Sequence, residues 1–240
     1  MKLAVMTDIH GNLPALRAVL RQIDAAGDIG RICCLGDMIG IGPDTNEVLG
    51  VLTERNDVFY TVGNHERAVL HIANGKGCLP GHETAYSHHQ WIAERLDPVY
   101  LPFLQSLPDR IEAEEEDCSL FMAHYHLQAD GEFVPIDSSP NGEKLDAMYA
   151  GTDFDVVCFG HHHPVHLFRT ERRTYLNPGS LGCHHQPLAR YGMIRTNGGE
   201  AIVELKEASY DNRAFLQSYF DLEVPDRDFI VNVFHGNQQI

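Results

Sequence analysis

Side chains that can bind metal ions stand at the ends of five apolar runs in this 240-residue chain. In order, these endings are Asp8-x-His10, Gly36-Asp37, Gly63-Asn64-His65-Glu66, His124 and Gly160-His161-His162-His163. Carboxylates, an amide oxygen and imidazoles suit Mn, Fe, Zn or Ni better than they suit thiolate-preferring metals. Two carboxylates and several neutral His side chains can hold two divalent ions, and two such ions can bind a phosphoryl group and activate the attacking water. A His that binds no metal could then protonate the leaving oxygen.

The elements that must position these side chains alternate between strand and helix in the first half of the chain. KLAVMTD, RICCLGD and DVFYTVGNHE have the composition of strands, and Pro14 opens an amphipathic helical pattern after the first of them. Such alternation predicts a parallel sheet. Ligands of open parallel sheets collect at the carboxyl ends of the strands, so we expect the five endings to converge on one spot.

The middle and the C-terminal part of the chain have different patterns. Residues 66 to about 107 are helical and rich in His, and we expect several helices that cover one side of the site, with His82, His88 and His89 on their surface. Hairpins are predicted over residues 109–126, 165–180 and 189–207. A helix is expected at 211–220, followed by a tail.

The chain contains no repeat, low-complexity tract or linker, which predicts one domain over residues 1–240, with the segment from about 208 to 240 packing on it. The formal net charge is -16, and such a surface repels the backbone of long nucleic acids. A small phosphorylated substrate remains compatible with this charge if metal ions supply positive charge locally. The oligomeric state is left open.

Neither a membrane-spanning run nor a signal-peptide pattern is present in the sequence, so we expect a soluble, cytoplasmic protein. The six Cys include no C-x-x-C pair and are expected to be buried thiols. Cys183, beside a Gly-rich turn, is the one Cys that could lie near a site.

Five blocks, TDIHGN, CLGD, GNHE, GHHH and NPGS, resemble in their order those of the calcineurin-like metallophosphoesterase superfamily, especially its small single-domain bacterial and archaeal phosphodiesterases. The resemblance covers roughly residues 1–195. It implies an α/β fold, a four-layer αββα sandwich with two mixed β-sheets flanked by helices. It also implies hydrolysis of a small phosphate ester, foremost a phosphodiester, by a hydroxide that bridges two divalent ions.

Other functions stay open beside this one. Symmetrical dinucleoside polyphosphate hydrolysis and phosphomonoester hydrolysis use the same kind of metal centre, and the C-terminal segment faintly resembles that of some members that cleave dinucleoside polyphosphates. A metal-binding scaffold without turnover is the alternative from another class. The presence of His65 and of a complete set of ligand types favours an enzyme.

The resemblance implies a role for each motif residue. It assigns seven metal ligands in two groups that share a bridging carboxylate: Asp8, His10 and His163 for the first ion, Asn64, His124 and His161 for the second, and Asp37 between them. His65 is expected to be catalytic, either as the proton donor or as a phosphate-binding cation. We expect His162 to point away, and His124 to be the ligand in preference to His126. Asn12 and the turn at residues 177–180 would shape the site.

Overall fold

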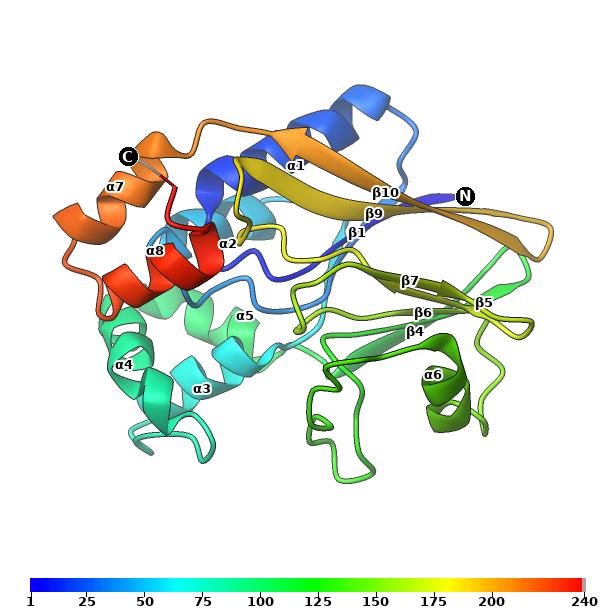
Figure 1. The fold of residues 1–240 in the computed structure, drawn as a ribbon, viewed down its shortest axis with the longest axis horizontal. Coiled ribbons are helices and arrows are strands. Elements are labelled where there is room, and N and C mark those ends of the chain that lie inside the picture. The colour runs from blue at the N-terminus through cyan, green and yellow to red at the C-terminus, as the bar shows by residue number, and fades with distance from the viewer. Residues whose placement is uncertain (239–240) are drawn as a thin grey trace.

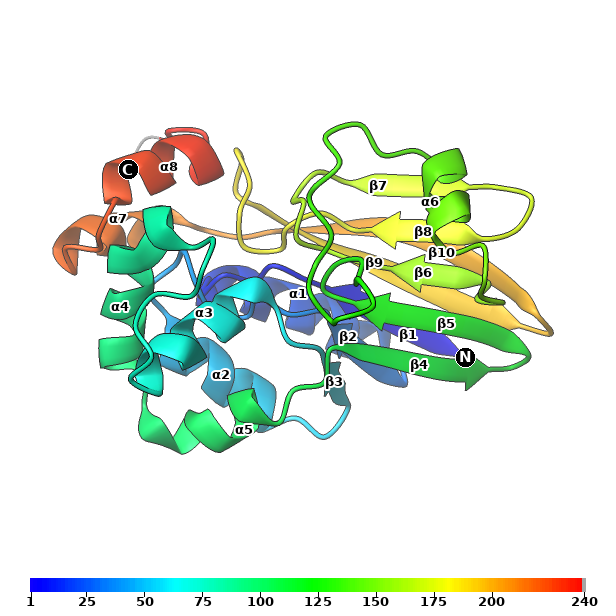
Figure 2. The ribbon, with the colours of Figure 1, turned by 90° about the horizontal axis from the view of Figure 1, so that it is seen from below.

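Two five-stranded β-sheets pack face to face, with helices on their outer faces, in the computed structural model, which describes residues 1–238 (Figures 1 and 2). The strand order is β10-β9-β1-β2-β3 in the first sheet and β4-β5-β6-β8-β7 in the second. Both sheets contain parallel and antiparallel pairs. The expected four-layer α/β sandwich with two mixed sheets is therefore confirmed.

The first sheet joins the N-terminal strands to a C-terminal hairpin. Its strands are β1 (Lys2–Met6), β2 (Arg31–Cys34), β3 (Val58–Tyr60), β9 (Leu188–Asn197) and β10 (Glu200–Ser209). The first three run parallel, as their alternation with helices predicts, while β9 pairs antiparallel with β1. The β9–β10 pair is the hairpin expected over residues 189–207.

The second sheet contains the other two expected hairpins. Its strands are β4 (Arg110–Glu115), β5 (Cys118–Ala123), β6 (Val156–Cys158), β7 (His166–Arg169) and β8 (Thr174–Asn177). The antiparallel pairs β4–β5 and β7–β8 flank the parallel strands β5, β6 and β8. The carboxyl ends of β5 and β6 thus lie side by side, which brings the residues that follow them close together.

Strand β1 shows how the layers are held together. Successive side chains of a strand point to opposite faces of its sheet. Leu3 and Val5 belong to the core between the sheets, together with Leu120 of β5. Ala4 and Met6 point to the other face and belong to the core beneath the first helices. A strand that is apolar on both faces is thereby buried on both faces, as expected for a parallel strand inside a layered fold.

Helices cover both outer faces and the end of the molecule where the strands point. They are α1 (Leu13–Ala26), α2 (Thr45–Thr53), α3 (Asn64–Ala73), α4 (Tyr86–Arg95), α5 (Leu101–Gln105), α6 (Gly142–Met148), α7 (Arg213–Asp221) and α8 (Arg227–His235), with short 3₁₀ turns η1 (Glu83–Ala85) and η2 (Pro98–Tyr100). The expected helical middle is confirmed. The segment expected as a tail after α7 instead forms helix α8. Among residues 1–238, no helix is both long and apolar enough to span a membrane.

Helix α8 packs onto the rest of the chain through one apolar side. Ile230 and Val231 belong to the same core as Phe215 and Tyr219 of α7 and as the buried side of α1. The ring of His235 contacts the hydroxyl of Tyr219 across the two helices, with 3.0 Å between Nε2 and the oxygen. Both views show α8 beside α4, at the end of the molecule toward which β1 and β2 point (Figures 1 and 2).

Candidate metal centre

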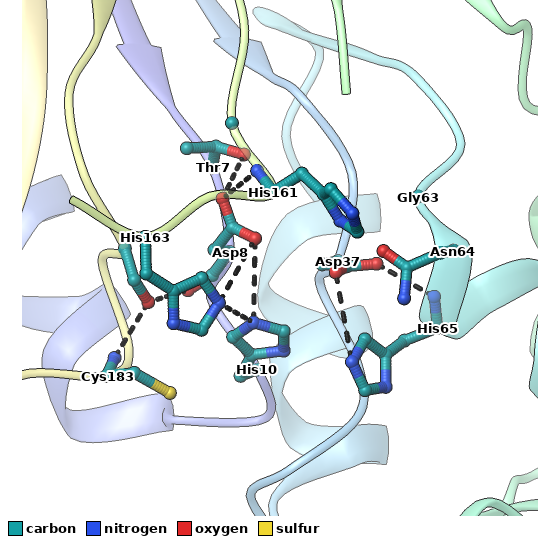
Figure 3. Close-up of polar contacts among 12 residues, drawn as sticks. Thr7, Asp8, His10, Asp37, Gly63, Asn64, His65, His161, His163 and Cys183 are labelled. Carbon is teal, nitrogen blue, oxygen red and sulfur yellow. Dashed lines mark hydrogen bonds and ion pairs between the residues drawn. The ribbon is translucent and has the colours of Figure 1, made fainter. Parts of the chain in front are cut away.

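The seven predicted ligands all lie just beyond strand ends, and the structure brings them together; Figure 3 labels all of them except His124. Asp8 and His10 follow β1, Asp37 follows β2, Asn64 follows β3, His124 follows β5, and His161 and His163 follow β6. These strands come from both sheets, whose parallel pairs put their carboxyl ends at a common edge. The ligands fall into two neighbouring groups, and their roles in metal binding stay a prediction.

Asp8, His10 and His163 form the first group. The Nε2 atoms of His10 and His163 lie 2.9 Å apart, and Oδ1 of Asp8 lies 3.6 Å and 3.5 Å from them. This Oδ1 is buried and has no hydrogen-bond partner, whereas Oδ2 accepts hydrogen bonds from the Thr7 hydroxyl and the His161 amide. Buried polar atoms almost always have a partner. A divalent cation between the three atoms would supply the missing one.

Asn64, His124 and His161 form the second group together with Asp37. The Nε2 of His124 lies 3.2 Å from Oδ2 of Asp37, 3.0 Å from Oδ1 of Asn64 and 3.2 Å from Nδ1 of His161. The other ring nitrogen, Nδ1, is 2.7 Å from the carbonyl oxygen of Leu35. A carbonyl can only accept, so Nδ1 donates there and Nε2 is directed at the group, as in metal-binding His side chains.

Asp37 stands between the two groups. Its carboxylate lies within 4.8 Å of ligand atoms of His10 in the first group and of His124 and His161 in the second. Burial opposes its ionisation, but the neighbouring His124 and His65 outweigh burial and lower the pKa of the Asp37 carboxyl. An ionised carboxylate in this place has the position that the predicted bridge requires.

The pKa of His124 indicates which positive charge a metal ion in the second group would replace. Burial opposes a charge on the imidazole, but the Asp37 carboxylate raises the pKa of His124 to about 9. Without a metal ion, the proton on Nε2 is the positive charge that balances Asp37. A metal ligand must give up that proton, so binding at the second group should release it and should strengthen as the pH rises.

Five of the predicted ligands have a backbone conformation that residues other than glycine rarely adopt. The φ angles are 54° for Asp8, 50° for His10, 49° for Asp37, 66° for His161 and 40° for His163. Each such residue costs about 1–3 kcal/mol and persists only where its surroundings hold it in place. One such constraint is the hydrogen bond from the amide of His10 to the carbonyl of Asp37, at 2.9 Å. This clustering of strain marks the strand ends as a functional site.

The buried side chain of Glu66 holds two of these loops together, a role that the sequence analysis did not assign. Its Oε2 accepts hydrogen bonds from the amides of Asp37 and Gly63, both at 2.8 Å. Its Oε1 accepts from the amides of Met38 and Ile39, at 2.7 Å and 3.2 Å. Its place three residues after the N-cap of α3 is the capping-box position, which is the sequence signal that could have revealed it.

His65, the predicted catalytic residue, lies beside Asp37 (Figure 3). Its Nε2 is 4.0 Å from Oδ2 of Asp37, and its Nδ1 is 2.9 Å from Nε2 of His89 on α4. Burial lowers the pKa of His65 well below its ordinary value and that of His89 to about 4. Both rings are therefore neutral at neutral pH, and one donates a hydrogen bond to the other. The glycine at position 40 leaves room for the pair, because a Cβ there would stand 2.4 Å from Nδ1 of His65.

The expectation that His88 and His89 lie on a helix surface is wrong. Their side chains are 4% and 1% exposed, because α4 turns this side toward α3 and the strand ends. The periodicity of the sequence did not predict this burial, because a His side chain is compatible with either the buried or the exposed side of a helix.

Other motif residues surround the centre without joining it. His126 is buried against the hydroxyl of Tyr149, 3.0 Å away, and the ring of His162 contacts that of His166, also at 3.0 Å. Neither belongs to the two ligand groups within residues 1–238. Cys183, in contrast, has its sulfur within 4.8 Å of ligand nitrogens of His10 and His163. Burial raises the pKa of this thiol.

The turn that begins at Asn177 supports the loop after β1, as the sequence suggested. The hydroxyl of Ser180 donates to the carbonyl of Asp8 at 2.8 Å. The side chain of Asn12 caps α1 through the amide of Ala15 and donates to the carbonyl of Gly182 at 2.7 Å. These bonds connect the C-terminal part of the domain to the residues around the first ligand group.

Comparison with known proteins gives one family and several relatives. A family model described as the calcineurin-like phosphoesterase superfamily domain matches residues 1–199. A protein of Methanocaldococcus jannaschii, itself named as uncharacterised, is 28% identical over 244 residues that cover 93% of this chain and 94% of the relative.

Two solved structures share the fold over nearly their whole length. A metallophosphoesterase from Sphaerobacter thermophilus superposes with a TM-score of 0.73 at 21% identity, covering 96% of this chain and 97% of that one. A hypothetical protein from Pyrococcus horikoshii superposes with a TM-score of 0.79 at 18% identity, covering 99% of both chains. At these identities the likeness establishes the fold.

Proposed function

The chain belongs to the calcineurin-like phosphoesterase superfamily, whose members are metal-dependent hydrolases of phosphoesters, and from this premise we propose that it hydrolyses a small phosphodiester with two divalent ions bound. The observation that carries the proposal is the pair of ligand groups that share Asp37. One group contains a buried carboxylate oxygen without a partner, and the other contains a His whose proton balances a buried carboxylate. Both features fit a site for cations.

The donor set determines which residues would hold the ions. The two groups would be Asp8, His10 and His163 for the first ion and Asn64, His124 and His161 for the second, with Asp37 shared. Oxygen and imidazole donors accept Mn, Fe, Zn or Ni. When bound, a pair of such ions neutralises charge on a phosphoryl group and lowers the pKa of a water molecule beside it.

His65 would donate the proton that the leaving oxygen needs. Its contact with His89 through Nδ1 leaves Nε2 facing Asp37 and the centre. Donation from the neutral ring would leave an imidazolate, so His65 would act in its imidazolium form, which the negative charge of a bound phosphoryl group favours. In that form Nδ1 donates to Nε2 of the neutral His89, and Nε2 carries the second proton. A proton held at Nε2, which faces the centre, is in the place that general acid catalysis requires.

A small substrate fits the charge of the protein better than a polymer does. The net charge of -16 gives a long polyanion no attractive surface, while the ions neutralise a single phosphoryl group locally. We therefore rank a small diester above long nucleic acid and above a folded phosphoprotein as the substrate.

The test is a comparison of substrates under metal-loaded conditions at fixed salt. The kcat/KM values of bis-p-nitrophenyl phosphate, p-nitrophenyl phosphate, diadenosine tetraphosphate, single-stranded DNA and a phosphopeptide are measured with Mn, Fe, Zn or Ni. We expect the small diester to be hydrolysed with the highest efficiency. A preference for the monoester or for diadenosine tetraphosphate would identify the alternative substrate classes, and one for DNA or the phosphopeptide would contradict the size argument.

Metal content separates the enzyme from a scaffold. Protein that retains two ions per chain by mass spectrometry but turns over no substrate would favour a metal-binding interaction module. Asp37→Asn protein serves as the background control, because it removes the shared carboxylate with minimal change of shape.

A further inference from the structure

A hollow of about 570 Å³ adjoins the centre on the side of His65. We call it the α8 pocket and define it by six of its lining residues: His65, His82, His89, Asp226, Phe229 and Phe234. Its volume is within the range of pockets that hold small ligands. Its walls come from three parts of the chain that are distant in sequence, namely the start of α3, the segment around η1 and α4, and helix α8.

Two residues that line the α8 pocket also contact residues of the metal centre. His65 lines the pocket and also approaches Asp37, with 4.0 Å between Nε2 and Oδ2. Phe234 lines the pocket and also packs against the ring of His163, at 5.7 Å between centroids. A group bonded to a phosphoryl held in the centre would therefore extend into the pocket past the residue that protonates the leaving oxygen.

The walls of the α8 pocket are aromatic. The rings of Phe229 and Phe234 meet edge to face at 6.2 Å, and those of His82 and His89 lie 5.6 Å apart. The side chain of Phe229 is 60% exposed although α8 has a buried apolar side available for packing. Aromatic rings left open to solvent beside a catalytic His offer stacking surfaces to a planar ligand.

The charges of the α8 pocket exclude one kind of occupant and favour another. The residues that line it, within the described part of the chain, include no Lys or Arg, and Asp226 supplies their single carboxylate. A second phosphate group would find no cation there. A neutral ring that carries an amino group could stack on the aromatic walls and donate a hydrogen bond to Asp226.

We propose that the α8 pocket binds the leaving group of the substrate, and that this group is a nucleoside whose planar base carries an amino group. The proposal rests on the proposed function, because it places the scissile phosphoryl group in the centre. Hydrolysis forms one P–O bond from water and breaks the P–O bond to the nucleoside, whose oxygen takes a proton from Nε2 of the imidazolium form of His65. This leaves the ring neutral, and the proton lost by the attacking water restores the imidazolium. Helix α8 lies beyond the residues 1–199 that the family model matches, so one wall of this pocket comes from outside the matched domain.

The kinetic test uses two diesters whose leaving alcohols differ only in the base. One is the methyl phosphodiester of the adenosine 5′-hydroxyl, and the other is the same diester of 1-O-methylribose. Stacking of a base on an aromatic side chain predicts a preference of about tenfold or more in kcat/KM for the adenosine diester. Phe229→Ala should remove most of that preference through KM and leave the base-free diester unchanged.

A matched control is available on the same helix. Val233 of α8 is 43% exposed and does not line the pocket, so Val233→Ala should keep the full preference for the adenosine diester. Equal kcat/KM values for the two diesters in the unchanged protein would overturn the proposal while leaving phosphodiester hydrolysis intact.

A binding measurement gives a readout that does not depend on turnover. The single Trp of the chain, Trp91, stacks on His88 behind the pocket wall, so its fluorescence should report adenosine added to metal-loaded protein. We expect a saturable change that Phe229→Ala weakens, and weaker binding of purine riboside, which lacks the amino group. Binding without hydrolysis of either diester would support the pocket and contradict the proposed function. No saturable binding of adenosine would overturn the pocket.

Discussion

The metal centre and the α8 pocket adjoin each other, yet they are built in different ways. The centre is assembled from loops at strand ends of both sheets, with five of the predicted ligands in a rare backbone conformation and with Glu66 holding two of the loops. The pocket is assembled from helices, and one of its rings, Phe229, is largely exposed. Under the proposed function, the reaction chemistry would depend on the main-chain framework, while selectivity would depend on side chains that can change without disturbing it.

The two regions should therefore respond differently to substitution. A change in the centre should affect every substrate and the retention of metal, whereas a change in the pocket should affect only substrates that occupy it. The predictions below test this division, beginning with the largest expected effect.

Asp37→Asn should abolish hydrolysis of all substrates and weaken metal retention. The carboxylate lies between the two ligand groups, and the amide removes its charge from both. The fold should persist, because the amide oxygen can still accept the hydrogen bond from the His65 amide that Oδ1 accepts at 2.9 Å. Activity and metal content per chain are measured together, with thermal unfolding of the metal-free variant as the control. Normal turnover with normal metal content would contradict the shared role of Asp37.

His65→Ala should keep both ions and lower turnover by about two to four orders of magnitude, the range for a positioned proton donor. The loss should be smaller for nitrophenyl leaving groups than for alkyl leaving groups, since an acidic leaving group needs little protonation. The measurement is kcat for a series of diesters with different leaving groups. Equal losses across the series would show that His65 binds phosphate and does not donate a proton.

His89→Ala should lower kcat about tenfold to a hundredfold, because it removes the hydrogen bond that orients the His65 ring. The base-free diester is the right substrate, since it lacks the base that would stack in the α8 pocket, which His89 also lines. We expect KM to stay unchanged and His89→Gln, which keeps a hydrogen-bonding group, to recover part of the rate.

The imidazole nitrogen resonances of His65 give a second measurement for His89. They should shift in His89→Ala protein and return toward their normal positions in His89→Gln protein. A normal kcat together with shifted resonances would show that this contact orients the ring without assisting catalysis. In that case turnover would depend on His65 and not on its contact with His89.

Acidification should destabilise the attachment of α8. Burial lowers the pKa of His235 to about 4, while in the unfolded chain the ordinary value of 6.5 applies. The unfolded state thus binds more protons between these values, and stability is fully present above pH 6.5 and falls as the pH approaches 4.

The contribution of His235 can be isolated in metal-free protein. His235→Asn removes the titration and can retain the contact with the Tyr219 hydroxyl. It should therefore reduce the loss of unfolding free energy between pH 7.5 and 4.5 by about 2 kcal/mol. Urea unfolding at several pH values measures the difference. Parallel curves for the two proteins would show that His235 does not contribute to the pH dependence.

Much of the fold followed from patterns that are local in the sequence. The apolar run of β1 ends at Asp8, and the similar runs of β2 and β6 end before Asp37 and His161. Strand ends of parallel sheets meet at one edge, so the position of these residues in their runs predicted that they would come together. The second mixed sheet and the four layers were predicted from the resemblance of five ordered blocks to a known family. Periodicity alone indicated only a parallel sheet and hairpins.

The surroundings of the centre were decided by tertiary packing. The pairing of His65 with His89 and the closure of the pocket by Phe229 join residues that are far apart in the chain. Local periodicity says whether a segment is helical, but the side of the helix that is buried depends on what packs against it. For this reason the sequence by itself determined which predicted ligands follow strand ends and in what order, whereas only the folded chain decided that the His residues of α4 turn inward and that α8 forms a wall beside the candidate site.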